Sequence, residues 1–246
     1  MNTDRSNEKE VALVFGGSRG IGAAAVRRLS YDGFSVGFTY VSRPDSAQHV
    51  VDAVAADGGH ALAVQADSAD AAAIRQAVEK VATHFGRLDV VVINAGVLRL
   101  GTIDTFTLED LDQVLQVNVR GVYVAIQAAV ARMGGDGRII TIGSNSAVRP
   151  LTPAGTVYGM SKAAVAAMVK GLALELAPRG IRVNNIQPGP IRTDMTAEHI
   201  ERIKDMVPLK QVGETEDIAE LVSYLAGASS RYMTGSSLTI DGGMAL

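Results

Sequence analysis

The sequence contains no cysteine, and this absence excludes several kinds of chemistry. Without cysteine the chain has no disulfides, no thiolate nucleophile and no cysteine-based zinc site. The histidines are few and far apart with no ligand-like spacing, so we expect no metal site; they are His49, His60, His84 and His199. The net charge is also small, because 23 Lys and Arg stand against 26 Asp and Glu to give −3. This balance gives no reason to expect a nucleic-acid polymer or a membrane as partner.

Long hydrophobic runs and linkers are missing as well. The first apolar run, 11–15, is too short for a signal-peptide core or a membrane span, so we expect a cytoplasmic protein. No linker rich in Pro, Gly or Ser and no internal repeat divides the 246 residues, and 47% hydrophobic residues are typical of a globular chain. We predict a flexible N-terminal leader over 1–9 and a single domain over 10–246.

Short β-branched runs alternate along the whole chain with longer, Ala-rich stretches of helical period. Several of the short runs are apolar at consecutive positions, which is typical of strands whose two faces are both covered. This alternation predicts an α/β fold: a Rossmann-type, doubly wound, seven-stranded parallel sheet with helices on both faces. The predicted strands are 11–15, 34–40, 61–65, 90–93, 138–142, 181–186 and 237–240, and the predicted helices are 20–31, 44–56, 69–85, 108–132, 156–178 and 214–226.

A glycine-rich turn follows the first predicted strand and opens the first predicted helix. Ligands of doubly wound sheets bind outside the carboxyl ends of the strands, where a helix N-terminus offers free N–H groups to a pyrophosphate. The glycines are spaced G-x-x-x-G-x-G, which differs from the commoner G-x-G-x-x-G, and a merely tight strand–helix turn is the alternative. We favour dinucleotide binding by this turn, with the candidates Gly16, Ser18, Arg19, Gly20, Ile21 and Gly22.

The end of the second predicted strand bears on which dinucleotide is bound. Selectivity for NAD needs an Asp or Glu there to accept a hydrogen bond from the ribose 2′-hydroxyl, whereas this chain has Tyr40, Ser42 and Arg43 and no acid before Asp45. Arg43 and Arg19 are suited to donate to a 2′-phosphate, although solvated surface arginines are the alternative. We therefore expect NADP(H) to be favoured over NAD(H).

The predicted helix 156–178 carries a candidate acid–base pair. Tyr158 and Lys162 are four residues apart, so they lie on one face of the helix, one turn from each other. A neighbouring ammonium stabilises a phenolate, and we expect it to lower the pKa of Tyr158 toward neutrality, where proton transfer is most effective. A surface Tyr/Lys pair is the alternative.

Small and polar residues follow other strands at the same predicted edge. A serine hydroxyl at position 144 is suited to bind a substrate oxygen, and small residues leave room for a planar ligand across the strand ends. The residues at this edge are Asn94, Ala95, Gly96, Ser144, Pro188, Gly189, Ile191 and Thr193.

With these residues the chain resembles the short-chain dehydrogenase/reductase family, and in particular its 3-oxoacyl-acyl-carrier-protein reductases, from about Lys9 to Leu246. The resemblance rests on the glycine turn, Asp67, Asn94-Ala95-Gly96, Asn118, Ser144, Tyr158-x-x-x-Lys162, Pro188-Gly189 and the closing Thr239–Gly243. It implies an NAD(P)-dependent oxidoreductase that interconverts a ketone or aldehyde and an alcohol, and a homotetramer with a dimer as the alternative. It also implies a catalytic tetrad of Asn118, Ser144, Tyr158 and Lys162.

The resemblance assigns cofactor roles to further residues. It implies that Asp67, with Ser68 beside it, binds the adenine, that Asn94 supports the adenosine side, and that Ile191 and Thr193 hold the nicotinamide carboxamide. It also assigns Tyr158 and Lys162 to the cofactor, Lys162 through the nicotinamide ribose hydroxyls, and we count Ala95, Gly96, Pro188 and Gly189 with the cofactor site. The family usually has its serine thirteen residues before the tyrosine, and that position holds Asn145 here. Ser144 directly follows its strand and is our choice, with Ser146 as the alternative.

The chain also resembles a subgroup of the family that includes a cyclic-di-GMP-binding mediator of biofilm dispersal. The shared segments are Gly16–Ala24, Ile142–Ser144 and Gln187–Ile191. This opens a second class of function, a nucleotide-binding regulator on the same fold. The substrate is not readable from the sequence; we expect its pocket to be lined by 97–100, 147–152 and a helical lid over 195–208, with Arg99 and Arg149 nearby.

Overall fold

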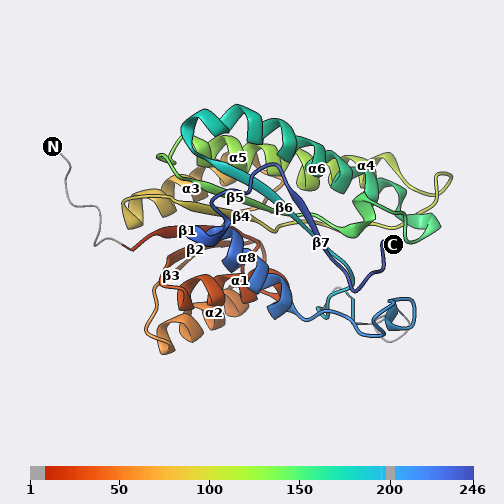
Figure 1. Cartoon of the computed structure of the whole chain (residues 1–246), viewed down its shortest axis with the longest axis horizontal. Helices are drawn as coiled ribbons and strands as arrows, with labels where there is room; N and C mark the ends of the chain where they lie inside the picture. The colour runs from red at the N-terminus through yellow and green to blue at the C-terminus, as the bar shows by residue number, and fades with distance from the viewer. Residues whose placement is uncertain (1–8, 195, 198–202) are drawn as a thin grey trace.

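A computed structural model describes residues 9–194, 196, 197 and 203–246 of the chain (Figure 1). The predicted leader, apart from Lys9, therefore lies outside the described residues, as does much of the predicted lid over 195–208. The described residues form one parallel seven-stranded sheet in the order β3-β2-β1-β4-β5-β6-β7. The strands are β1 (Val11–Phe15), β2 (Ser35–Tyr40), β3 (Ala61–Gln65), β4 (Val90–Ile93), β5 (Arg138–Ile142), β6 (Arg182–Pro188) and β7 (Ser237–Ile240).

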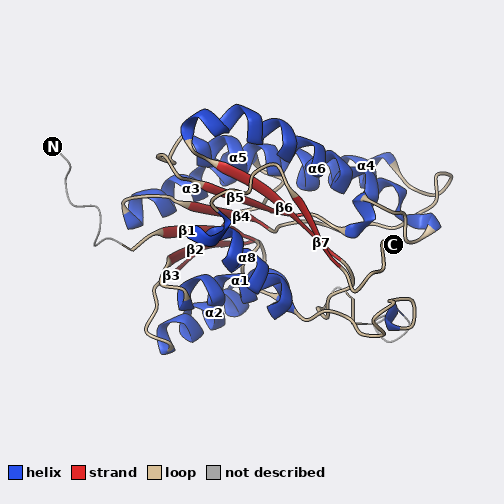
Figure 2. Cartoon of the chain, viewed as in Figure 1, coloured by secondary structure: helices blue, strands red, loops and turns tan. Residues whose placement is uncertain are grey.

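Helices cover both faces of the sheet, as Figure 2 shows. The α-helices are α1 (Gly20–Tyr31), α2 (Pro44–Ala56), α3 (Ala71–Phe85), α4 (Leu108–Leu115), α5 (Val122–Val130), α6 (Thr156–Leu176) and α8 (Thr215–Ala226). One hydrophobic cluster joins α3, α5 and α6 to one face of the sheet, and a second joins α1, α2 and α8 to the other. Because both faces are covered, β1, β4 and β5 are buried at every position, which explains their continuous apolar runs.

The predicted Rossmann-type, doubly wound α/β fold is confirmed, and most elements end within two residues of the predicted ends. The strand order reverses between β1 and β4, which is the switch point where such sheets bind ligands. Gly16 follows β1 and Asn94 follows β4, so the sheet brings these two predicted site residues together. Indeed the Asn94 Nδ2 donates a hydrogen bond of 2.8 Å to the carbonyl of Gly16.

The predicted helix over 108–132 is helical from Leu108 to Val130, but it is not α-helical throughout. Between α4 and α5 the chain forms a π-helical segment, Gln116–Gly121. Tertiary contacts account for this segment: the Gln116 side chain donates to the carbonyl of Ala69 at 2.7 Å. A Cβ at Gly121 would lie 2.3 Å from the carbonyl oxygen of Ser68, so only glycine allows this close approach. π-Helical turns inside α-helices are frequent at functional sites.

The helix α6 is long and rich in apolar residues. Within the described residues, the stretch Pro153–Arg179 is long and apolar enough to cross a membrane by length and composition alone, with a mean hydropathy of 1.2. Its buried residues, among them Val165, Val169 and Ala173, belong to the hydrophobic cluster beneath α3 and α5. The helix is therefore an element of the α/β domain, with apolar residues also on its exposed side, such as Leu174.

Candidate active site

The glycine turn after β1 forms a tight cradle at the N-terminus of α1. Gly16 and Gly20 have φ angles of +75° and +53°, in the left-handed region that favours glycine. Gly22 has a different reason, because a Cβ there would lie 2.0 Å from the Gly16 carbonyl oxygen. The Gly16 N–H donates to Thr39 Oγ1 at 3.0 Å, which ties the turn to β2. The backbone thus leaves an open, glycine-lined helix N-terminus, suited to a phosphate group.

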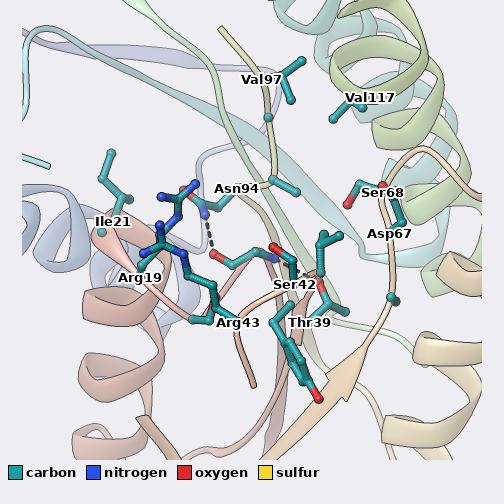
Figure 3. A pocket seen from close by; sticks show the side chains of 18 of the residues that line it. Arg19, Ile21, Thr39, Ser42, Arg43, Asp67, Ser68, Asn94, Val97 and Val117 are labelled. Atoms are coloured by element: carbon teal, nitrogen blue, oxygen red, sulfur yellow. Dashed lines mark hydrogen bonds between the residues drawn. The ribbon is translucent and has the colours of Figure 1, made fainter. Parts of the chain in front are cut away.

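A pocket of about 340 Å³ opens beside this turn and extends along the carboxyl ends of β1, β2 and β4 (Figure 3). It brings together most of the residues predicted to bind a cofactor. These are Gly16, Ser18, Arg19, Gly20, Ile21, Tyr40, Ser42, Arg43, Asp67, Ser68, Asn94, Ala95, Gly96 and Thr193. The pocket also has five lining residues that sequence reasoning missed, Thr39, Val41, Ala66, Val117 and Asp194, and it includes Val97, which was assigned to the substrate side.

Three of the missed lining residues could have been predicted, because they are adjacent in sequence to residues that were predicted. Thr39, Val41 and Ala66 adjoin residues that were predicted, and they follow from extending β2 and β3 to their ends. Val117 enters the pocket only because of the π-helical segment. Asp194 enters from the chain after β6, far from the β2 end in sequence, and no sequence pattern signals that approach.

Apart from Tyr158 and Lys162, which lie on α6, four predicted cofactor residues do not line this pocket. Gly22 packs behind the turn, as described above. Pro188 closes β6, and a Cβ on Gly189 would lie 2.5 Å from the Cβ of Asp241, so both shape the strand end. The Ile191 side chain is 5% exposed and belongs to the hydrophobic core, because a backbone bridge to Gly213 turns it inward. These residues position the pocket wall rather than face the cavity.

Asp67 and the β2 loop are held in place by the chain itself. The Asp67 carboxylate accepts a hydrogen bond of 2.8 Å from the N–H of Ala69, so its orientation is fixed while it lines the pocket. Gln65 Nε2 donates to the carbonyl of Val41 at 2.9 Å and anchors the loop that carries Arg43. Figure 3 shows the side chains of Arg19 and Arg43 close together on one side of the pocket.

A second set of polar side chains surrounds α6. A hydrogen bond joins the Ser144 hydroxyl to the Tyr158 phenol, and Ser144 is 8% exposed. Ser144 Oγ also accepts from the N–H of Ser146 at 3.1 Å, which fixes its rotamer. The neighbouring Asn145 side chain points elsewhere and donates to the Asp241 carboxylate at 3.1 Å. The hydroxyl that meets the phenol is therefore that of Ser144.

Lys162 lies on the same face of α6 as Tyr158. Its Nζ is 5.7 Å from the centre of the Tyr158 ring and donates to the Ile142 carbonyl at 2.9 Å. Burial lowers the pKa of Lys162 to about 8, because an apolar surrounding disfavours the ammonium form. This residue thus lies beside the phenol, as the i, i+4 spacing predicts.

The predicted lowering of the Tyr158 pKa is wrong for the protein without ligand. Burial raises the pKa of Tyr158 above its ordinary value, since the phenolate is poorly solvated, and the hydrogen bond with Ser144 opposes that shift without cancelling it. Lys162 does not cancel the effect of burial on the Tyr158 pKa, because its Nζ lies 5.7 Å from the centre of the ring and donates to the Ile142 carbonyl.

The π-helical segment delivers Asn118 to the same region. Its Oδ1 accepts from the N–H of Val97 and its Nδ2 donates to the Val97 carbonyl, each at 2.9 Å. The same Nδ2 donates to Ser161 Oγ at 3.2 Å, so Asn118 links the β4 loop to α6 next to Lys162. With 1% of its surface exposed, Asn118 is a fixed part of this region.

Gly96 connects the two halves of the site. It lines the pocket, and a Cβ placed on it would lie 3.3 Å from Asn118 Oδ1 and 3.5 Å from Lys162 Nζ. The dinucleotide-type pocket therefore lies next to the region that holds Asn118 and Lys162. No cluster of three or more metal-ligating His, Asp or Glu side chains occurs among the residues that the structure describes.

Comparison with known proteins identifies the class to which this fold and site belong. Residues 16–245 match a family model described as enoyl-(acyl carrier protein) reductase. A short-chain dehydrogenase/reductase from Serratia marcescens has 49% sequence identity and a TM-score of 0.95, covering 97% of this chain and 99% of that one. The chain belongs to the short-chain dehydrogenase/reductase family of oxidoreductases.

Two further relatives bear on ligands. A short-chain dehydrogenase from Burkholderia cenocepacia, solved in complex with NADP, has 45% identity and a TM-score of 0.94, covering 97% of this chain and 99% of that one. The cyclic-di-GMP-binding biofilm dispersal mediator protein of Escherichia coli K12 is 38% identical over 236 residues, which are 95% of this chain and 96% of that protein. The chain is thus similar to relatives associated with a dinucleotide cofactor and with a cyclic dinucleotide.

Proposed function

We propose that the protein is an NADP(H)-dependent reductase that converts a ketone or aldehyde carbonyl to an alcohol. The observation that carries this proposal is the position of Gly96, which lines the dinucleotide-type pocket and lies next to Lys162, the partner of Tyr158 on α6. A pocket that only bound a nucleotide would have no use for a phenol, a serine and an ammonium beside it.

The residues present fit a phosphorylated dinucleotide. The glycine turn lines the pocket at the N-terminus of α1, where the first N–H groups of the helix have no partner within the helix and are suited to a pyrophosphate. Arg19 and Arg43 line the adjoining part of the pocket and supply guanidinium donors for a 2′-phosphate. Asp67 and Ser68 line the pocket and would bind the adenine, and Asn94 holds the cradle through its hydrogen bond to the Gly16 carbonyl.

The chain's own residues then position and protonate the substrate oxygen. NADPH, when bound, supplies the hydride for the carbonyl carbon. Ser144 donates a hydrogen bond to the carbonyl oxygen, and Tyr158 donates its proton to that oxygen as negative charge develops there. Tyr158, whose pKa burial raises above its ordinary value, is protonated at neutral pH, as a proton donor must be. The buried ammonium of Lys162 lies 5.7 Å from the ring and favours the phenolate that remains.

The substitution Tyr158→Phe tests this mechanism. It removes the proton donor and keeps the ring, so we expect the melting temperature and NADPH affinity to stay close to wild type while turnover is almost lost. The measurement is NADPH oxidation with a panel of aldehydes, ketones and diketones, with NADPH binding followed by fluorescence. A variant that retains about a tenth or more of the wild-type rate contradicts the role of Tyr158, since general acid catalysis typically contributes about 10²–10⁴-fold.

A second candidate function is a nucleotide-binding regulator that sequesters a cyclic dinucleotide in the same pocket. The similarity to the E. coli biofilm dispersal mediator favours it. The two proposals separate in one pair of assays, carbonyl turnover and cyclic-di-GMP titration by calorimetry. Micromolar binding of cyclic-di-GMP together with no turnover on any carbonyl of the panel would reverse the order of the two candidates.

A further inference from the structure

A single carboxylate lies beside both arginines of the pocket. Asp194 Oδ2 is 3.7 Å from Arg19 Nη1 and 3.9 Å from Arg43 Nη1. The three residues come from separate segments, the N-cap of α1, the N-cap of α2 and the chain after β6, and all three line the pocket. Within the described residues, Arg19 and Arg43 have no other acidic partner. One carboxylate oxygen therefore occupies the place at which both guanidinium groups would meet an anion.

The end of β2 lacks the acid that an NAD-binding site would place there, and Asp194 supplies a carboxylate to the same part of the pocket from the chain after β6. A carboxylate near the adenosine ribose accepts a hydrogen bond from a 2′-hydroxyl. It repels a 2′-phosphate, which carries up to two negative charges and needs the same guanidinium groups. NADP(H) binding therefore requires that the ion pairs of Asp194 with Arg19 and Arg43 break, whereas NAD(H) binding does not.

We propose that Asp194 is a specificity-determining residue that competes with the 2′-phosphate of NADP(H) for Arg19 and Arg43 and so narrows the preference for NADP(H) over NAD(H). The inference rests on the proposed function, because it concerns the same cofactor pocket. The side chains of Asp194, Arg19 and Arg43 are 71%, 56% and 60% exposed, so water screens the interaction and its effect is moderate. The opposite arrangement, in which Asp194 closes over a bound phosphate and holds both arginines on it, predicts the reverse effect of removing the charge.

The test measures ligand binding rather than turnover. Calorimetric titrations of the full chain with 2′,5′-ADP and with 5′-AMP compare wild type, Asp194→Asn and a matched control, Asp57→Asn, which removes an equal charge at the C-cap of α2. We expect Asp194→Asn to tighten binding of 2′,5′-ADP by roughly two- to fivefold, the range of an exposed ion pair, and to leave 5′-AMP unchanged or weaker. The control should bind both ligands like wild type.

A background that lacks the arginines shows whether Asp194 acts through them. In the Arg19→Gln/Arg43→Gln protein, the substitution Asp194→Asn should no longer tighten binding of 2′,5′-ADP. The inference is overturned if Asp194→Asn leaves the affinity for 2′,5′-ADP unchanged or weakens it, or if the gain persists without the arginines. Failure of the proposed cofactor preference has a different signature, because the wild-type protein would then bind 5′-AMP as tightly as 2′,5′-ADP.

Discussion

The substitution Ser144→Ala examines the inner end of the site most directly. Ser144 is 8% exposed, accepts from the N–H of Ser146 at 3.1 Å and is hydrogen-bonded to the Tyr158 phenol. In the proposed reaction it is a donor to the substrate oxygen, and the loss of one such donor costs about 3–4 kcal/mol, or roughly 10²–10³ in kcat. The loss also removes a hydrogen bond that opposes the raised pKa of Tyr158, so that pKa should rise further.

The matched control is Ser146→Ala, two residues along the same loop. Ser146 takes part through its backbone N–H, which alanine retains, so we expect a change of about twofold or less in kcat. Both variants should fold, because each of the two hydrogen bonds lost at Ser144 is worth about 1 kcal/mol of stability. The assay is NADPH oxidation with the best carbonyl of the panel, beside NADPH binding and melting temperature. A Ser144→Ala enzyme that keeps a third of the wild-type kcat, or a Ser146→Ala enzyme that loses more, refutes the choice of Ser144.

Two further predictions concern pH and assembly. The pKa of Lys162 falls from 10.5 to about 8 on folding, so between these two pH values the unfolded chain binds more protons than the folded one. The contribution of Lys162 to the free energy of unfolding should therefore rise by up to about 1.4 kcal/mol per pH unit in this range. This rise should be absent in Lys162→Met. Denaturant unfolding of both proteins at pH 7 to 10 measures this rise. If the free energy of unfolding changes with pH identically in wild type and Lys162→Met, the lowered pKa of the buried Lys162 is contradicted. Apolar surface is exposed on α4, α6 and α5 at Leu108, Leu174 and Tyr123. We therefore expect subunit contacts in a homotetramer, with a dimer as the alternative. Sedimentation that finds only monomer contradicts this expectation.

Local sequence determined the elements and the phosphate cradle. The runs at 11–15, 61–65, 90–93, 138–142 and 237–240 coincide with strands in the structure, because apolar and β-branched residues leave a strand signature within a few residues. In 11–15, 90–93 and 138–142 every residue is buried, as in strands covered on both faces. The cradle is equally local, since Gly16 and Gly20 adopt positive φ angles within one turn of chain. Parallel strands place their carboxyl ends at one edge, so the sequence also predicted which loops share the pocket.

Tertiary structure decided the features that depend on contacts between distant segments. The π-helical segment Gln116–Gly121 packs against Ser68 and Ala69, which are distant in sequence. The hydrophobic periodicity within 108–132 does not predict that contact. The pKa of Tyr158 is governed by burial, which the i, i+4 spacing to Lys162 does not encode. Asp194 meets Arg19 and Arg43 only after β6 has been added to the sheet, so the charge at the mouth of the pocket is a property of the folded chain.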